Sequence, residues 1–523
     1  MRHTGLPALL ILVSACTSPP RELSAATDTE RLDSNSTGSS RPYTDPGKPL
    51  QDPASAQDAT APKGSPPFTL EASVPLVTWN AGERRYELRL VDPATGQGVA
   101  DREPIEIKKG STYAPTIIVS ADGTRLAAVT GVGSACEAFA GFSAGACWPS
   151  ADAIRLIDVR TWREVVTDFS AHFSPSHSPF KGWASPLVFS QDNRRFAVAH
   201  HDREGTSVLV FDAETGRLIN QQALAIRPRL MEFTLDGSQL VIYGSPLAED
   251  PGISQPDPPS ALLLDASTLE VQWKTLLPGI LDGTWCLGNC ETENIQEGGD
   301  ARFVYWSPAV VFDAELGRLH IVHADEDRLT TVDFLGHSVR TLAIGRAPTL
   351  IERLLALTAE VAEAKYWPEG GVKSAVLSRD GSILYVVGQT MALSKNSNGQ
   401  WQATETPLGL HVVDVNSGHE LTFRETDSSW IRISADRRHL ILAAAFDDPT
   451  ELLEAETLDQ VGRVEGWNVQ AGRRLDGRPV VLLASWTGES PTAPPRFSML
   501  ELEPFEVVTP WSASGEAFWA ASP

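Results

Sequence analysis

The 523-residue chain has few basic residues and few methionines, and both shortages limit the classes of protein to which it can belong. Only 43 Lys and Arg oppose 67 Asp and Glu, so the net charge of -24 argues against nucleic acid as a partner, because phosphates would be repelled. Four Met beside 40 Gly and 37 Pro indicate many turns and few long helices. A mean hydropathy of -0.14 excludes a bundle of membrane helices, while 42% hydrophobic residues suffice for a folded core.

The first residues, MRHTGLPALLILVSAC, have the pattern of an export signal. A basic Arg2 precedes an apolar run over 6–13, which is too short to span a bilayer of roughly 30 Å. Residues 13–16, Val-Ser-Ala-Cys, resemble the lipobox of bacterial lipoproteins, in which the cysteine receives a diacylglycerol before cleavage. The resemblance implies that 1–15 are a signal peptide and that the mature chain begins at lipidated Cys16. An ordinary secretory signal with an incidental cysteine is the alternative.

Two features follow the lipobox. Residues 17 and 18 are Thr and Ser rather than Asp. In Gram-negative members of this family, the absence of aspartate directly after the lipidated cysteine implies sorting to the outer membrane. The segment 16–67 is rich in Ser, Thr, Pro, Ala, Asp and Gly and has almost no large apolar residue. Such a composition cannot offset the entropy of ordering, so we expect a disordered tether between the anchor and a folded body at 68–523.

Four cysteines remain after Cys16, and an even number in an exported chain favours two disulfides. Proximity in the sequence favours the pairs Cys136–Cys147 and Cys286–Cys290 among three connectivities. A zinc site is the alternative, but the spacing is not CxxC and no histidine stands near either pair.

Two segments recur through the body of the chain. The first is a polar residue, a turn and an apolar residue that opens a strand. Its copies are SADGTRLAAV from Ser120, SQDNRRFAVA from Ser190, TLDGSQLVIY from Thr234, DAELGRLHIV from Asp313, SRDGSILYVV from Ser378, SADRRHLILA from Ser434 and SASGEAFWAA from Ser512. The second is an apolar run that ends, in most copies, in Asp and a Gly-bearing turn, the pattern of a strand entering a hairpin. Its copies are 87–96, 153–162, 207–216, 261–270, 327–336, 409–418 and 463–472, with a weak eighth at 497–506.

Repeat units of roughly 45 to 80 residues with several short strands favour propeller blades over a helical solenoid. The segments resemble the repeats of WD40-like and YVTN-type β-propellers of bacterial envelope proteins, where an SPDG turn precedes one strand and a VxDxxTG string closes another. The resemblance implies an all-β fold, a single propeller of seven four-stranded blades, or eight if the weak copy counts. Residues 74–108 and the C-terminal copy complete each other, which predicts a shared blade that closes the ring.

Four segments interrupt the repeat and are expected to form long loops: residues 131–152, 244–260, 277–305 and 348–367. The last has apolar residues on one broad side and a capping-box spacing at its start, which predicts an amphipathic helix. Packing of this helix on the propeller is the simpler role, and binding of a partner is the alternative.

No string of residues forms a complete catalytic or metal-binding motif. Ser143 lies in GFSAG, which matches the GxSxG string of nucleophile elbows, but this string sits in a Gly- and Ala-rich loop. His320 and His323 are expected on a strand, where a spacing of three places side chains on opposite faces. The sequence therefore predicts no catalytic residue, no metal ligand and no cofactor.

Weaker candidates stay open. His200, His201 and Asp202 end a repeat strand, and lactonase and quinoprotein propellers gather such residues around their axis. The acidic string ADEDR at 324–328 offers oxygen ligands for calcium but no complete calcium-loop motif. Aromatic rings near strand ends can stack on sugars or anchor a protein, although core packing is commoner. The tryptophans in such places are Trp79, Trp183, Trp285 and Trp367.

These features together predict a lipoprotein of the bacterial cell envelope, anchored at the outer membrane. We expect its propeller to be a non-catalytic binding or scaffolding module, with another envelope protein as its partner. Two other functions stay open: a lactonase-like hydrolase with a metal site in the central channel, and a module that binds cell-wall glycan.

Overall fold

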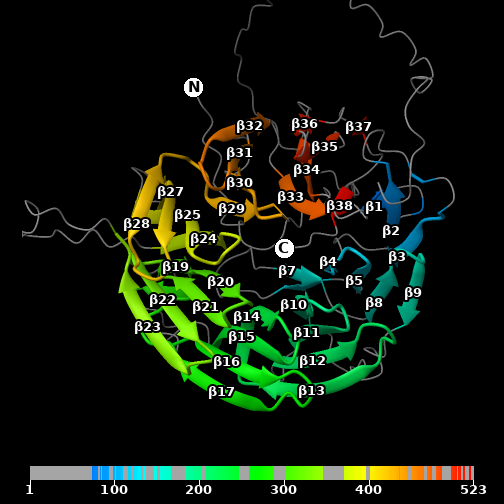
Figure 1. Ribbon diagram of the computed structural model, residues 1–523, viewed down its shortest axis with the longest axis horizontal. Helices are drawn as coiled ribbons and strands as arrows, with labels where there is room; N and C mark the ends of the chain where they lie inside the picture. Colours follow the sequence, from blue (N-terminus) through cyan, green and yellow to red (C-terminus); the bar gives the residue numbers. More distant parts are fainter. Residues whose placement is uncertain are drawn as a thin grey trace, which may run out of the picture.

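In the computed structural model, the described part of the chain runs from Ser73 to Trp519 with internal gaps. The longest gaps are residues 137–146, 167–182, 247–257, 288–301, 346–369 and 486–495. Every helix or strand assigned within the described residues is a β-strand, and none of those residues form a helix that could cross a membrane. The helix expected at 348–367 lies outside the described residues. Figure 1 shows the strands arranged as a ring of sheets around a central axis.

The described residues form eight blades: six four-stranded sheets, one five-stranded sheet and one seven-stranded sheet. The all-β propeller expected from the repeats is therefore confirmed, and the higher of the two expected blade counts holds. The weak repeat copy at 497–506 falls on β35 (Arg496–Leu502) and β36 (Phe505–Val507). Neighbouring strands pair antiparallel, except that β19 (Arg302–Ser307) pairs parallel with β24 (Gly370–Leu377) in the seven-stranded sheet. Inner strands of successive blades, such as β10 (Trp183–Phe189) and β14 (Ile226–Phe233), contact each other.

Each blade has an inner strand near the axis, two central strands and an outer strand at the rim (Figure 1). In that order, the strands of blade 1 are β38 (Ala517–Trp519), β1 (Val74–Asn80), β2 (Arg85–Val91) and β3 (Ile105–Lys109). Those of blade 2 are β4 (Thr116–Val119), β5 (Arg125–Thr130), β8 (Ala153–Asp158) and β9 (Arg163–Val166). Those of blade 3 are β10 (Trp183–Phe189), β11 (Arg195–His201), β12 (Thr206–Asp212) and β13 (Leu218–Leu224). Those of blade 4 are β14 (Ile226–Phe233), β15 (Gln239–Pro246), β16 (Ser260–Asp265) and β17 (Val271–Leu276).

The second half of the ring follows the same plan. Blade 5 contains β20 (Ala309–Asp313), β21 (Arg318–Val322), β22 (Arg328–Asp333) and β23 (Ser338–Ala343). Blade 6 contains β24 (Gly370–Leu377), β25 (Ile383–Lys395), β27 (Leu410–Asp414) and β28 (Glu420–Arg424). Blade 7 contains β29 (Trp430–Ile433), β30 (His439–Ala443), β31 (Thr450–Glu454) and β32 (Gln460–Val464). Blade 8 contains β33 (Asn468–Arg473), β34 (Pro479–Ser485), β35 and β36. Further strands are β6 (Ser134–Cys136), β7 (Cys147–Pro149), β18 (Gly283–Leu287), β19 (Arg302–Ser307), β26 (Trp401–Pro407) and β37 (Trp511–Ser512).

The ring closes as the repeat predicts. Strand β38, from the C-terminal end of the chain, pairs antiparallel with β1, with Val77 opposite Phe518. Blade 1 is thus built from both ends of the chain, and this pairing leaves no free sheet edge at the junction.

The hydrophobic core lies between neighbouring blades, because each sheet packs both faces against its neighbours. Central strands are accordingly apolar on both faces: four successive residues of β16, 261–264, are buried. One core cluster joins blades 3 and 4 through residues such as Val210 and Leu240, and another joins blades 6 and 7 through Val387 and Leu442. Outer strands such as β17 and β23 are mostly exposed.

In blades 2 to 8, the turn between the inner and second strands and the turn between the third and outer strands lie on one face of the ring, here named the turn face. In blade 5 the inner strand ends at Asp313 and the next begins at Arg318, while the third ends at Asp333 and the outer strand begins at Ser338. Since these strands are antiparallel, both turns are on the same side. The opposite side, named the insertion face, carries the connections between the central strands and those between blades.

Local hydrogen bonds build the turn face and repeat from blade to blade. In blade 4, Asp236 Oδ1 accepts from the Thr234 hydroxyl at 2.8 Å and from Ser238 N at 3.0 Å, and Thr234 Oγ1 accepts from Gln239 N at 3.1 Å. Gly237 closes the turn at a φ of 67°. These donors lower the pKa of Asp236. The same bonds recur at Asp122, Asp192, Asp380 and Asp436.

A second recurring contact ties each of several outer strands to the following blade. Arg424 on β28 donates to Leu458 O in the second turn of blade 7 at 2.7 Å. Trp273 on β17 stacks on His337 in the second turn of blade 5, with ring centroids 5.3 Å apart. Equivalent contacts join Arg102 to Thr161, Asn220 to Thr268 and Arg340 to Val415.

Candidate functional site

All four long interruptions of the repeat leave from the insertion face. Segments 131–152 and 244–260 connect the central strands of blades 2 and 4, whereas 277–305 and 348–367 lie in the connections from blade 4 to 5 and from blade 5 to 6. Strand β25 also extends past its blade partner on this side and pairs with β26. One face of the propeller therefore carries the four long segments that interrupt the repeat.

A buried carboxylate, Asp282, ties the connection between blades 4 and 5 to blade 4. Arg229 of β14 donates from Nη1 to Asp282 Oδ1, and Tyr243 of β15 donates its hydroxyl to Oδ2 at 2.8 Å. Arg229 also donates from Nη2 to Ser307 Oγ at 2.8 Å. Asp282 balances the arginine charge, and burial raises the pKa of Tyr243, so its hydroxyl stays a donor.

Lys373 on β24 makes a matching tie between blades 5 and 6. Its side chain is 6% exposed, and Nζ donates to Glu326 O at 3.0 Å and to Asp327 Oδ1 at 3.3 Å. Burial lowers the pKa of Lys373, and the Asp327 charge partly offsets this effect. Burial also raises the pKa of nearby Asp325. The loop between β21 and β22 is thereby fixed to the next blade.

An apolar contact joins the two networks. Trp306, the residue before Ser307, packs with Ala324, which lies at the start of the loop that Lys373 holds. Gly371 makes this approach possible, since a Cβ there would lie 2.8 Å from Ala324 O and 3.3 Å from the Trp306 ring. Together Asp282, Lys373 and Trp306 form a rigid base under the insertions of blades 4 to 6.

The side chains of this base fix the position of the neighbouring loops. Its cations are paired with carboxylates, Arg229 with Asp282 and Lys373 with Asp327. Across the described residues, no group of three or more His, Cys, Asp or Glu side chains is placed to hold a metal ion. What the arrangement provides is a fixed platform at the ends of the strands that these segments connect.

The structure places the two candidate histidines on opposite sides of one sheet, as their spacing indicates. His320 Nδ1 lies 3.1 Å from Thr331 Oγ1, and His323 Nε2 lies 2.8 Å from Thr330 Oγ1. Because these threonines are adjacent on β22, they face opposite ways. Burial lowers the pKa of each histidine to about 4, so both are neutral at pH 7.

The remaining candidates are dispersed. Cys136 on β6 stands opposite Cys147 on β7 as a Cα partner, at a separation typical of disulfides, and the bond itself stays a prediction. Cys286 lies on β18, and the string 324–328 forms the loop that Lys373 holds. His200 and His201 end β11; Trp79, Trp183 and Trp285 lie on β1, β10 and β18. Cys16, Ser143, Asp202, Cys290 and Trp367 lie outside the described residues.

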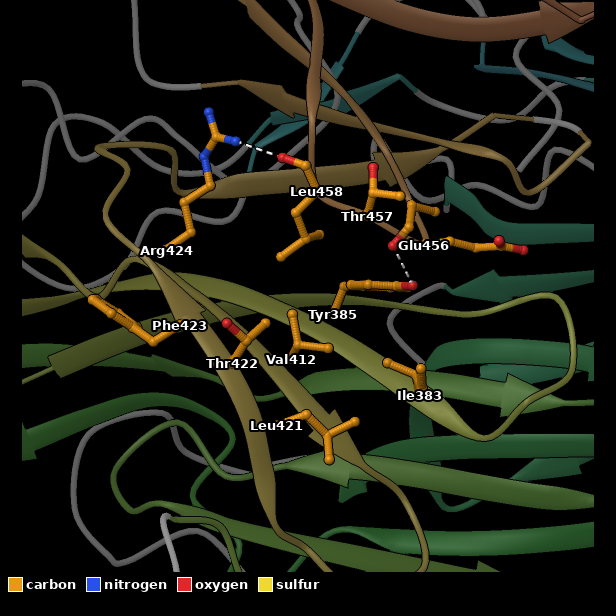
Figure 2. A pocket seen from close by; sticks show the side chains of 11 residues that line it. Ile383, Tyr385, Val412, Leu421, Thr422, Phe423, Arg424, Glu456, Thr457 and Leu458 are labelled. Carbon is orange, nitrogen blue, oxygen red and sulfur yellow. Dashed lines mark hydrogen bonds between the residues drawn. The ribbon is translucent and has the colours of Figure 1, made fainter.

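A cavity of about 420 Å³ lies at the rim, lined by residues of blades 6 and 7. Figure 2 shows the side chains that line it. Tyr385 crosses its floor and donates to Ala455 O at 2.8 Å, while Arg424 donates to Leu458 O at one end. These polar groups are bonded within the protein, so the cavity offers mainly apolar side chains, including Leu421 and Phe423. It lies away from the insertion face, in the seam between an outer strand and the next blade.

No protein-family model and no curated protein matches the chain. Among solved structures, the dihydro-heme d1 dehydrogenase NirN in complex with DHE aligns over 87% of this chain and 76% of its own, at 14% identity and a TM-score of 0.47. The Dos1 propeller aligns over 76% and 84%, at 11% identity and a TM-score of 0.43. The Myceliophteria thermophila Cps50 (Swd1) β-propeller domain aligns over 78% and 99%, at 12% identity and a TM-score of 0.36. These likenesses are too distant to bear on function, and the propeller is established by its own sheet order.

Proposed function

We propose that this protein is an exported lipoprotein, held at the outer membrane by a diacylglycerol on Cys16, whose propeller binds another envelope protein through the insertion face. Residues 17–67 serve as a flexible tether between anchor and propeller. The propeller supplies a scaffold and no catalytic group.

The asymmetry between the two faces is the observation that carries this proposal. Tight turns of repeated sequence occupy one side of the ring, whereas long segments of unrelated sequence project from the other. Loops on a rigid scaffold are where binding specificity resides. The ties at Asp282 and Lys373 support it further, because they fix the bases of these loops and so reduce the entropy lost on binding.

Site-specific photo-cross-linking tests the proposal in the native envelope. A photoreactive amino acid is placed at Arg328 on the insertion face or at Arg194 on the turn face, two arginines whose side chains are 54% and 84% exposed. We expect one adduct of defined mass from position 328 and none from 194, and loss of this adduct in a Cys16→Ser variant that no longer reaches the membrane. Equal adducts from both positions, or an adduct from 194 alone, would refute binding through the insertion face.

A further inference from the structure

Blade 5 departs from the other blades at the tips of its turns. In the second turn of blades 2, 3, 4, 6 and 7, the second residue after the acid that ends the third strand is polar, whereas in blade 5 it is Leu335. These polar residues are Arg160, Glu214, Ser267, Asn416 and Glu456. The first turn of blade 5 follows the same pattern from Asp313 to Gly317, and places Leu316 where the second turns have Thr, Ser or Gly.

These two leucines form one exposed apolar tip. Leu335 is 74% exposed and Leu316 is 45% exposed. The two turns lie side by side: Phe334 N donates to Gly317 O at 3.0 Å, and a Cβ on Gly317, the residue after Leu316, would lie 3.2 Å from Leu335 Cγ. Leu335 belongs to the same turn as His337, which Trp273 of blade 4 covers, so the tip rests on a rigid inter-blade contact.

The same face receives the N-terminal part of the chain. Strand β1 begins at Val74, which pairs with Val91 at the end of β2, directly before the second turn of blade 1. The described chain therefore enters blade 1 on the turn face. Figure 1 shows β1 and β23 on opposite sides of the ring, so this junction and the leucine tip lie across the axis from each other.

We propose that the leucine tip of blade 5, Leu316 and Leu335, docks on the lipid bilayer to which the chain is anchored. The inference rests on the proposed lipid anchor at Cys16. A tether from Cys16 to Ser73 spans roughly 40 Å as a random coil, so it permits contact but fixes no orientation. A second contact on the far side of the ring sets the turn face against the membrane and points the insertion face outward.

A bilayer fits this tip better than a protein partner does. A stable protein interface buries about 800 Å² on each partner, and Leu316 and Leu335, even with the exposed Leu235 in the first turn of blade 4, offer far less apolar surface. A tethered propeller needs only a weak second contact, because the anchor keeps the tip near the bilayer at high effective concentration. The net charge of -24 restricts this contact to lipids without net charge, since anionic headgroups would repel the protein.

The test uses full-length lipidated protein in phosphatidylcholine vesicles. An environment-sensitive fluorophore is attached at Leu335→Cys or, as the control, at Glu214→Cys, which occupies the same turn position in blade 3. Wild-type protein treated with the reagent gives the background from its own cysteines. We expect the label at 335 to shift to the blue and to be quenched several-fold less by iodide, and more by nitroxide lipids, than the label at 214.

Each other outcome overturns the inference in an identifiable way. Equal iodide quenching at 335 and 214, with lipid on Cys16 shown by mass spectrometry, refutes the leucine tip and leaves the anchor standing. Shielding at 335 without vesicles would mean that a second copy covers the tip. Absence of lipid from Cys16 refutes the anchor and this inference together. Leu316→Ser in the labelled protein should return the 335 label to the control value, and no change would also count against the proposal.

Discussion

The two faces of the propeller are held together in different ways. On the turn face, hydrogen bonds such as those of Asp236 join residues two to five positions apart and repeat in blade after blade. On the insertion face, Asp282 bonds Arg229 across 53 residues and Tyr243 across 39 residues, and this arrangement does not recur among the described residues of the other blades. The comparison teaches that the repeat builds a modular face from local bonds, while the individual function of the chain depends on a face stabilised by unique, long-range contacts.

The difference predicts that substitutions in the contacts of the insertion face lower the free energy of unfolding more than substitutions in the turns do. The largest effect is expected for Asp282→Ala, which leaves Arg229 and the Tyr243 hydroxyl without their acceptor. Removal of one partner from a buried ion pair costs about 3–5 kcal/mol, and the partial exposure of Arg229 favours the lower end. Chemical denaturation of the folded body measures this change in the free energy of unfolding.

Asp282→Asn is the matched control for that variant. The amide keeps one acceptor oxygen for Tyr243 or Arg229 but removes the charge, so an intermediate loss is expected. A loss below about 1 kcal/mol for Asp282→Ala, the size of an ordinary surface change, would show that the insertion face is as modular as the turn face.

Acid should act on the buried histidines before it acts on the turn aspartates. Burial lowers the pKa of His323 from 6.5 to about 4, so the unfolded chain binds a proton in this range that the folded protein does not. Stability therefore falls as pH drops from 6.5 to 4, by roughly 3 kcal/mol for this histidine. The turn aspartates have lowered pKa values, so their contribution is lost only below the unfolded value near 3.8.

The pH dependence of unfolding in wild type and in His323→Asn checks this order. Asparagine can still bond Thr330 but does not titrate, so the variant should lose less stability than wild type between pH 6.5 and 4. Parallel curves for the two proteins would contradict the assignment of acid sensitivity to His323.

Single turns should contribute modestly and independently. Asp236→Ala removes the acceptor of the Thr234 hydroxyl and of Ser238 N, which costs about 1–2 kcal/mol. Asp380→Ala makes the same change in blade 6. Because the two turns share no partner, the double variant should lose the sum within about 0.5 kcal/mol. A larger coupling energy in this double-mutant cycle would show that the turn face acts as one cooperative unit.

The same contrast explains what could be predicted from the sequence. Turn bonds span a few residues, so strings such as SADG at Ser120 and DAETG at Asp212 indicated the strands, the turns and the closing blade. Asp282 in LPGILD looks like any loop aspartate, because its partners are distant in the chain. The available signal was Lys373, a lone charge within the apolar strand GGVKSAVL. Disulfide formation, lipidation and the partner depend on chemistry outside these local patterns.

The smallest expected effect concerns backbone strain within a single turn. Arg437 has a φ of 59°, at the turn position that Gly123, Gly237 and Gly381 occupy in other blades. A non-glycine residue in this left-handed region loses about 1–2 kcal/mol of stability, and glycine removes that loss. Glycine also has greater freedom in the unfolded chain, which cancels part of the stability gained. Arg437→Gly should therefore raise the free energy of unfolding by about 0.5 kcal/mol, within the range of a favourable glycine substitution. Arg438→Gly, the next residue, lacks the positive φ and should lower it by a similar amount. If both variants are destabilised equally, the arginine side chain at 437 makes a contact worth more than the strain, and this turn differs from its counterparts.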